Sequence, residues 1–369
     1  MVSELARLFL KLGITSFGGP AAHVALMEEE FVHKRQWLSR EKFLDLIALT
    51  NLIPGPNSTE LAIHIGYLRA GWLGFAVAGL CFILPAFLIV ALIAAFYTAY
   101  ASLPEVQSFL VGAKAVVFAV ILLAFERFAK SLWRIDQWKE LFYKNTWSEK
   151  RRVLVSFIFI ASIYMSLVRG YSEILILFNC GLISLFISAR FPRTRTHELG
   201  TLFWVFFKIG AVLFGSGYVL LSFLQTELVQ ARPWLTQSQL LDAVTVGQFT
   251  PGPVFTTATF IGYLLHGPVG AVLATVGIFT PAFLFVALSI PLYKKLETSL
   301  HFRAILDGVV AGSLGLLFTV FWTFGPEIAK TALTLGIFTV SLVFLKRTRF
   351  PSAGLIFLGG LLSFFATKI

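Results

Sequence analysis

The chain carries two copies of one module, and this duplication constrains its fold more than any other feature. Residues 9–57 align without a gap with residues 206–254, at an offset of 197. One residue is then dropped, and residues 66–112 match residues 262–308 at an offset of 196. Identical residues occur along both alignments: Lys11 and Lys208, Gly13 and Gly210, Glu30 and Glu227, Arg35 and Arg232, and Pro85 and Pro281. Because such self-similarity indicates duplicated structural units, we expect an N-terminal repeat at 1–189, a cytoplasmic linker at 190–200 and a C-terminal repeat at 201–369.

Composition places both copies in a membrane. Hydrophobic residues make up 57% of the chain and charged residues 13%, whereas soluble domains carry roughly a quarter charged residues. A helix needs about 20 apolar residues to cross a bilayer, and each copy offers six apolar segments. These lie near 5–27, 43–67, 72–100, 106–126, 153–169 and 172–189, and near 201–225, 239–263, 268–293, 305–325, 329–345 and 351–367. We predict an all-α polytopic membrane protein, which excludes a soluble enzyme and a nucleic-acid binder.

The basic residues indicate that the two copies have opposite orientations. Cytoplasmic loops are enriched in Lys and Arg, and the net charge of +11 lies mostly in short segments between apolar runs. The loop at 127–152 carries eight basic residues, whereas its counterpart at 324–330 carries one. In the loop before the fourth segment the bias reverses: the loop of copy one, at 101–106, has no basic residue, whereas that of copy two, at 291–304, has three. The copies are therefore expected to be inverted repeats.

Inversion requires an odd number of crossings in each copy, so one of the six segments must fail to cross. The second segment is broken by Pro54-Gly55-Pro56, and its counterpart by Pro251-Gly252-Pro253. Each arm of about 11 residues reaches about 16 Å, which is half of a hydrocarbon core of about 30 Å. We therefore predict about five transmembrane helices and one re-entrant helical hairpin per copy. Both termini would lie outside, although Arg7 and Lys11 argue against an outside start.

The two PGP breaks are the first candidates for a substrate site. Proline removes an amide donor and interrupts a helix, and irregular backbone at membrane depth is tolerated where it is buried or lines a cavity. Interrupted helices at matching positions of inverted repeats indicate a transporter site near the midplane. A simple kink that eases packing is the alternative. The candidate residues are Pro54, Gly55, Pro56, Pro251, Gly252 and Pro253.

Small and hydroxyl residues near the breaks extend the candidate site. In the first segments these are Gly18, Gly19, Gly215, Ser216 and Gly217. They either permit close helix contact or expose amides and a helix N-terminus suited to an anion. After the PGP breaks they are Asn57, Ser58, Thr59, Thr256 and Thr257. These either cap the following helix or hold the oxygens of an oxyanion.

Ionisable residues inside apolar segments are candidates for function. Glu60 and His64 are four residues apart, on one helix face, and either handle protons or form a structural pair. Lys11 and Lys208 either supply positive charge for an anion or extend to the interface. His23, alone on its apolar segment, is expected to be a hydrogen-bonded core histidine.

Other patterns predict supporting roles or none. Asp45 and Asp242 are expected to be interface anchors at helix starts. Cys81 and Cys180 are isolated, so we expect neither a disulfide nor a metal site, and no motif for a cofactor is present. We expect no cleavable signal peptide at the start of the chain, where Val2–Lys11 lacks a basic leader followed by a short apolar core.

At these motifs the sequence resembles the chromate ion transporter family, in its long-chain two-domain form. In copy one the motifs are Ser16-Phe17-Gly18-Gly19-Pro20, the run from Asn51 to Tyr67, and Cys81-Phe82-Ile83-Leu84-Pro85-Ala86. In copy two they are Phe214-Gly215-Ser216-Gly217-Tyr218, Gln248-Phe249-Thr250-Pro251-Gly252-Pro253 and Phe279-Thr280-Pro281-Ala282-Phe283. Ser216 stands where the family pattern suggests a third glycine.

The resemblance implies export of chromate from the cytoplasm across the inner membrane, energised by the proton motive force. It also implies two homologous halves of opposite topology, and sulfate as a competing mimic. The expected function is thus a secondary active transporter that works by alternating access and is not an enzyme. An uptake permease for sulfate or another oxyanion, or a passive anion channel, is the alternative. The expected partners are a chromate- or sulfate-like oxyanion and the lipid bilayer, with a homodimer left open.

Overall fold

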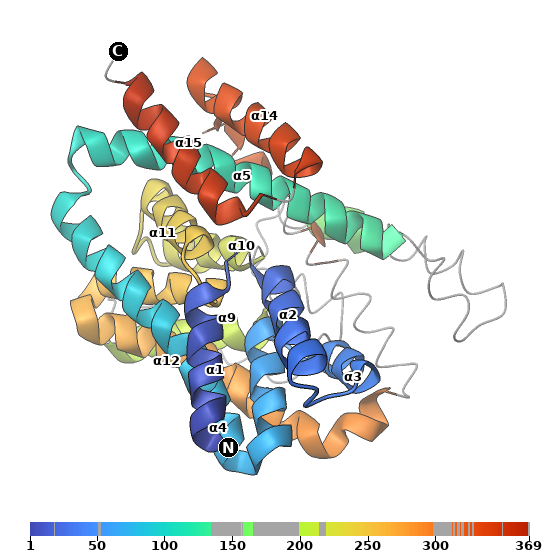
Figure 1. The fold of residues 1–369 in the computed structure, drawn as a ribbon. Helices are drawn as coiled ribbons and strands as arrows, with labels where there is room; N and C mark the ends of the chain where they lie inside the picture. Colours follow the sequence, from blue (N-terminus) through green and yellow to red (C-terminus); the bar gives the residue numbers. More distant parts are fainter. Residues whose placement is uncertain are drawn as a thin grey trace.

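The computed structural model describes residues 1–17, 19–50, 53–133, 158–164, 199–213, 219–297, 328–348 and 350–367, together with Ser156 and isolated residues between 312 and 326. Every regular element within these ranges is a helix (Figure 1). The fifth and sixth apolar segments of copy one lie largely outside the described residues, as do the linker and most of the fourth segment of copy two.

The two copies present their helices in the same order. Copy one contains α1 (Val2–Thr15), α2 (Pro20–Glu28), η1 (Glu29–Lys34), α3 (Arg40–Thr50), α4 (Asn57–Tyr100) and α5 (Pro104–Trp133). Copy two contains α9 (Leu199–Val212), α10 (Leu220–Leu224), η4 (Gln225–Gln230), α11 (Gln237–Phe249), η5 (Val254–Thr256), α12 (Thr257–Glu297), α14 (Ala332–Arg347) and α15 (Ser352–Ala366). In both copies a helix leads through a break into a helix that ends in a π-helical turn, and a PGP break separates the next helix from a long one.

The long helices α4 and α12 are each folded back on themselves. Gly71 has φ 59° and ψ −149°, and Gly267 has φ 59° and ψ −150°, so the same turn recurs in both copies. The hydroxyls of Thr259 and Thr275 lie 2.7 Å apart, although 16 residues of straight helix would separate them by about 24 Å. Each long helix is therefore a hairpin with a short arm before the glycine and a long arm after it. The turns fall where the sequence separates its second and third apolar segments.

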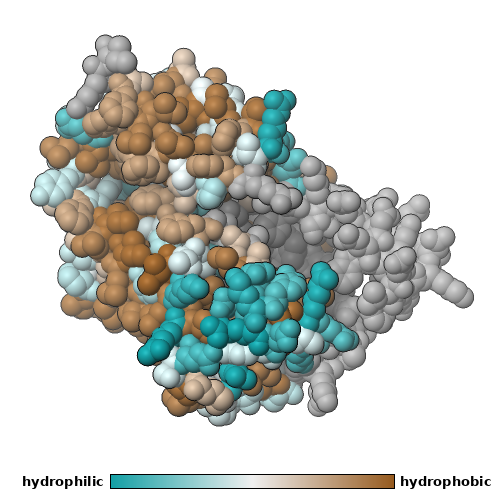
Figure 2. Space-filling model, viewed as in Figure 1, coloured by the Kyte–Doolittle hydropathy of each residue, from teal (hydrophilic) through white to brown (hydrophobic). Residues whose placement is uncertain are grey.

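The surface of the long arms is suited to lipid. On α4 the exposed apolar side chains recur every four residues, along one helix face: Leu80, Leu84, Leu88, Leu92 and Phe96. Three described helices are long and apolar enough to cross a membrane, at Asn57–Tyr100, Pro104–Glu126 and Val254–Pro291. Hydrophilic side chains instead gather over α2, η1 and α3 (Figure 2), where Glu29, Lys34 and Arg40 are exposed. This division of the surface agrees with the expected membrane protein.

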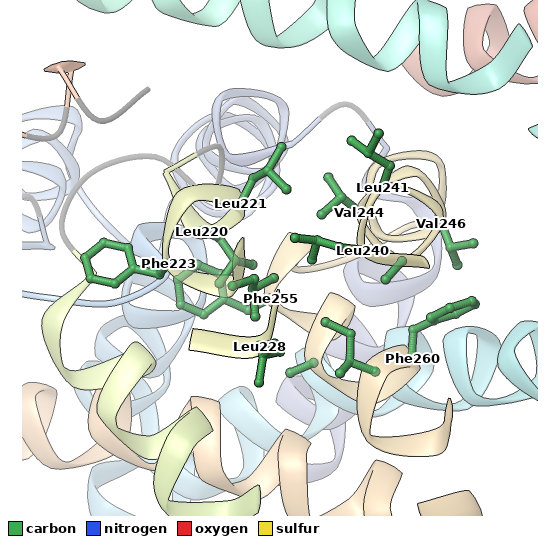
Figure 3. Close-up of a cluster of buried hydrophobic side chains, with 14 of the residues drawn as sticks. Leu220, Leu221, Phe223, Leu228, Leu240, Leu241, Val244, Val246, Phe255 and Phe260 are labelled. Carbon is green, nitrogen blue, oxygen red and sulfur yellow. The ribbon is translucent and has the colours of Figure 1, made fainter. Parts of the chain in front are cut away.

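Helix packing joins the two copies. Helix α1 packs on α4 and α9 packs on α12, so the first segment of each copy lies along its own hairpin. Helix α4 also packs on α12, and α5 of copy one packs on α14 and α15 of copy two (Figure 1). The largest core cluster includes side chains from α10, η4, α11, η5 and α12, as Figure 3 shows around Phe255. This core supports the PGP break of copy two.

Candidate functional site

The PGP breaks end one helix and begin another in each copy. Helix α3 ends at Thr50 and α4 begins at Asn57, while α11 ends at Phe249 and the next helical turn, η5, begins at Val254. The central glycines have positive φ values, 139° at Gly55 and 84° at Gly252. Residues with a side chain rarely adopt this region, so glycine is required at both turns. The prolines on either side explain why neither helix continues through the break.

The two breaks contact the opposite copy through reciprocal hydrogen bonds. The N–H of Gly55 donates to the carbonyl of Leu213 at 2.8 Å, and the N–H of Gly252 donates to the carbonyl of Ser16 at 2.9 Å. Leu213 is the equivalent of Ser16, and Gly252 the equivalent of Gly55, both at the offset of 197. Exchanging the copies therefore maps one bond onto the other, which is the pattern of a two-fold interface. Each PGP break meets the end of the first helix of the other copy.

The glycine break of copy one is partly described, and that of copy two is not. Gly19 has φ 78° and is followed by Pro20 at the first position of α2, where the missing amide costs nothing. Gly18, Gly215, Ser216 and Gly217 lie outside the described residues.

His23 connects the first segment of copy one to the start of α4. Its Nε2 lies 3.1 Å from the carbonyl of Ser16, and its Nδ1 lies 3.1 Å from the hydroxyl of Ser58. A carbonyl only accepts, so Nε2 carries the hydrogen and Nδ1 accepts from Ser58. His23 is fully buried and, as expected, hydrogen-bonded. It lies at the candidate site, however, because the Ser16 carbonyl also accepts from Gly252.

Buried polar atoms without partners concentrate beside the break of copy one. Thr59 Oγ1, Ser16 Oγ and both carboxylate oxygens of Glu60 are buried without a hydrogen-bond partner. The Glu60 carboxylate lies directly against Gly55, where a Cβ would collide with Oε1. Such groups are rare in folded proteins and call for an explanation such as a ligand or a transported proton.

At the break of copy two, the two threonine hydroxyls that follow the PGP have partners within the protein. The hydroxyls of Thr256 and Thr257 donate to the carbonyls of Pro253 and Val254, each at 2.8 Å. Copy two also has no carboxylate between Thr256 and Phe260. The two breaks thus share a backbone arrangement but differ in chemistry.

Glu60 and His64 do not pair with each other, although one helix face carries both. His64 Nε2 instead lies 3.3 Å from the hydroxyl of Ser289 on the long arm of α12. Asn57 begins α4 in a half-buried position, and Pro56, Pro251 and Pro253 are buried at the breaks, whereas Pro54 is half-buried. The short arm of α4 therefore links the break to the opposite copy through His64.

Comparison with known proteins identifies the kind of protein that contains this site. The family model for chromate transporters matches residues 3–185 and 200–364. The chain belongs to the chromate transporter family. Members of this family are transport proteins and not enzymes, and this one is a membrane protein.

Individual relatives cover most of the chain. A probable chromate transport protein of Synechococcus elongatus is 32% identical over an alignment of 328 residues that covers 86% of this chain and 82% of the relative. A chromate transport protein of Cupriavidus metallidurans is 32% identical over 339 residues, covering 85% and 80%. An uncharacterized transporter of Methanocaldococcus jannaschii is 27% identical over 370 residues, covering 92% and 88%. No solved structure matches the chain.

The two lysines proposed as anion ligands have different surroundings in this member of the family. Lys208 Nζ lies 2.6 Å from Glu227 Oε1, and Glu227 also pairs with Arg232. Lys208 therefore shares a single carboxylate with Arg232, so these three groups together keep one net positive charge. Lys11 is exposed on α1, while the Glu30 carboxylate of its own copy pairs with the Arg35 guanidinium at 2.9 Å.

One buried charge cluster of this family member was missed by the sequence interpretation. Lys114 Nζ lies 2.7 Å from Asp242 Oδ1, and the Tyr97 hydroxyl donates to Asp242 Oδ2 at 2.9 Å. Asp242 was expected at the membrane interface, but its side chain is only 2% exposed. Its side chain is buried within the protein, where Lys114 from another helix compensates its charge. Lys114 stands inside the apolar segment 106–126, and that position alone marks an ionisable residue for attention.

The part of the chain that the structure describes contains no group of three or more His, Cys, Asp and Glu side chains able to hold a metal ion. The described part of the candidate site consists of the two helix breaks, hydroxyl side chains, His23, His64 and the Glu60 carboxylate.

Proposed function

We propose that the chain exports chromate from the cytoplasm as a secondary active transporter, by alternating access around the paired PGP breaks. The observation that carries this proposal is the reciprocal bonding of Gly55 with Leu213 and of Gly252 with Ser16. It brings the interrupted helices of both copies to one place, as in transporters whose substrate site lies between two repeats. The relatives named as chromate transport proteins supply the substrate.

The proposed topology has two inverted copies in the inner membrane, each with a re-entrant hairpin. Helix α3 has 11 residues, and the short arm at 57–70 has 14. These reach about 16 and 21 Å, which is less than the hydrocarbon thickness of about 30 Å. Both arms thus fit a hairpin that returns to the side from which it entered. The bias of basic residues between equivalent loops supports the inversion.

The hydrogen-bonding capacity of the breaks suits a tetrahedral oxyanion. The Ser58 hydroxyl hydrogen points to His23, so the Thr59 and Ser16 hydroxyls are the described side-chain donors left without a hydrogen-bond partner at the copy-one break. In copy two, Thr256 and Thr257 donate to carbonyls in this conformation and need only rotate to reach an anion. Amides and hydroxyls recognise oxygens and not the central atom, so sulfate is expected to compete with chromate.

The electrical part of the proton motive force favours export of such an anion. Moving one charge through 100 mV changes the free energy by about 2.3 kcal/mol. The export of a dianion from a cell that is 100 mV negative inside is therefore favoured by about 4.6 kcal/mol. Export therefore needs no proton bound together with the substrate. Protons can contribute through Glu60 in the return step, when the anion has left.

A second candidate function is proton-linked oxyanion uptake, and Glu60 is the observation that favours it. Its carboxylate is fully buried and unpartnered beside Gly55. A negative carboxylate next to a dianion is repulsive, so a proton would bind together with the anion. A proton and an anion that move together are driven inward by an inward proton gradient.

Purified protein in proteoliposomes distinguishes these functions. For export we expect outward chromate flux that increases when a potassium diffusion potential makes the interior negative, with sulfate competing. Counterflow of labelled chromate against its gradient separates a carrier from a channel, because a channel cannot concentrate its ion. Uptake would be established instead by three results together. The flux would not change with the membrane potential, it would run inward when a pH gradient is imposed, and Glu60→Gln would abolish this response to the pH gradient.

A further inference from the structure

The charge cluster at Lys114 lies outside the PGP breaks and joins the two copies. Lys114 belongs to α5 and Tyr97 to the long arm of α4, both in copy one, whereas Asp242 and Ser238 belong to α11 in copy two. Besides its ion pair with Asp242, Lys114 Nζ donates a hydrogen bond to the hydroxyl of Ser238 at 3.1 Å. Tyr97 is fixed by the ring of Phe260, with centroids 5.0 Å apart.

This cluster has the composition of an oxyanion site that the protein's own carboxylate occupies. An ammonium group and a phenol hydroxyl converge on the two oxygens of Asp242, one on each. Chromate and sulfate offer the same kind of acceptor oxygen with one more negative charge. The Lys114 side chain is 12% exposed and that of Asp242 2%. The Lys114 side chain is therefore more accessible to solvent than the Asp242 carboxylate that pairs with it.

The charge cluster lies between the PGP breaks and one face of the membrane in the proposed topology. Asp242 precedes the break residue Thr250 by eight residues of α11, which is about 12 Å along the helix. In the proposed topology α11 begins on the outer side, because the loop before it carries only Arg232 where its counterpart carries four basic residues. The cluster thus lies between the breaks and the exterior.

The sequence provides this cation in one copy only. Asp45 and Tyr293 are the equivalents of Asp242 and Tyr97, but Val310 occupies the position equivalent to Lys114. This asymmetry fits a role tied to one side of the membrane.

We propose that Lys114 and Tyr97 form a second oxyanion-binding position on the outer side of the breaks, from which Asp242 displaces the substrate. The proposal rests on the proposed transport function and adds a release step to it. The anion leaves the breaks, replaces Asp242 on Lys114, and is lost to the exterior when the carboxylate returns. The structure shows the position after release, with Asp242 bound.

The alternative is a clamp that only holds α11 against α5, and a double variant separates the two roles. Replacing a buried ion pair by apolar residues is often neutral for stability. We therefore expect Lys114→Met/Asp242→Leu to keep its thermal midpoint in detergent but to export chromate about tenfold more slowly. The matched control is Lys346→Met/Glu126→Leu, a pair of the same length, 2.7 Å, that also involves α5 but is more exposed. The control should export at the wild-type rate.

Direct binding provides the second measurement. Asp242→Asn keeps the side-chain volume and removes the competing charge, so it should bind sulfate about tenfold more tightly than the wild-type protein in titration calorimetry. Chloride at the same ionic strength serves as the comparison. Wild-type export by the double variant, or unchanged sulfate affinity in Asp242→Asn, would overturn the proposal. If the double variant fails to fold, the binding result decides. If wild-type protein moves no chromate, the proposed function fails, whereas the binding result still tests the site.

Discussion

Replacing Gly252 by alanine should destabilise the protein for two separate reasons: its positive φ and the lack of space for a Cβ. Gly71 and Gly66 each show one of these two causes without the other. Gly252 has φ 84°, and a Cβ built there would lie 2.7 Å from the Cβ of Ala86. Gly71 has a positive φ of 59° but open space around its missing Cβ. Gly66 has ordinary helical backbone, but its Cβ would collide with the carbonyl oxygen of Gly74 across the α4 hairpin. Gly336 on α14 has neither problem.

The expected magnitudes follow from these two causes. A positive-φ backbone such as that of Gly71, with φ 59° and ψ −149°, is nearly confined to glycine and costs an L-residue about 1–3 kcal/mol, so Gly71→Ala should lower the free energy of unfolding by that amount. Overpacking costs about 1–3 kcal/mol, and Gly66→Ala should reach the upper part because backbone cannot move aside as a side chain can. Gly252→Ala combines both causes, for about 2–6 kcal/mol. Gly336→Ala should stabilise by about 0.5–1 kcal/mol, because alanine favours a helix.

The assay is unfolding of the four variants in one detergent, by denaturant titration followed through tryptophan fluorescence, with chromate flux measured in parallel. The order of stability should be Gly336→Ala, wild type, Gly71→Ala, Gly66→Ala and Gly252→Ala. If Gly252→Ala is no less stable than Gly71→Ala, the contact between this break and Ala86 does not exist in the protein. The reciprocal packing of the two breaks would then be refuted, because that contact is part of it.

Three further predictions concern single side chains. Glu60→Gln should remove the response of transport to an imposed pH gradient while the response to membrane potential remains; a retained pH response would assign protons elsewhere. His23→Ala leaves the Ser58 hydroxyl without its acceptor and the Ser16 carbonyl with the Gly252 amide alone, and it opens a cavity. This should cost about 2–5 kcal/mol in denaturant titration, and an unchanged midpoint would contradict the buried contacts. Thr236→Ala removes the capping box of α11 and should cost about 1 kcal/mol without changing sulfate competition; a changed competition would place α11's start in the binding site.

The sequence was sufficient for features that depend on local pattern. Each PGP break interrupts its helix because two prolines flank a glycine with positive φ, whereas a single proline such as Pro85 lies within a helix. The turns at Gly71 and Gly267 occur where one apolar segment ends and the next begins. The family also followed from motifs at fixed spacing, and the family model matches residues 3–185 and 200–364.

Side-chain roles were less predictable, because partners come from distant parts of the chain. Glu60 and His64 share a helix face, yet His64 contacts Ser289, which is 225 residues away. Asp242 has the sequence signature of a helix start, but Lys114 and Tyr97 allow it to be buried.

The sequence by itself determined that this chain is a duplicated, helical membrane transporter, since periodic apolar segments and repeated breaks are properties of local composition. Tertiary structure alone decided that each PGP amide bonds to the other copy and that a lysine in one copy pairs with an aspartate in the other. The physical reason is that a buried donor or charge must find a partner wherever one is available in space. No local pattern specifies which of several distant groups will supply it.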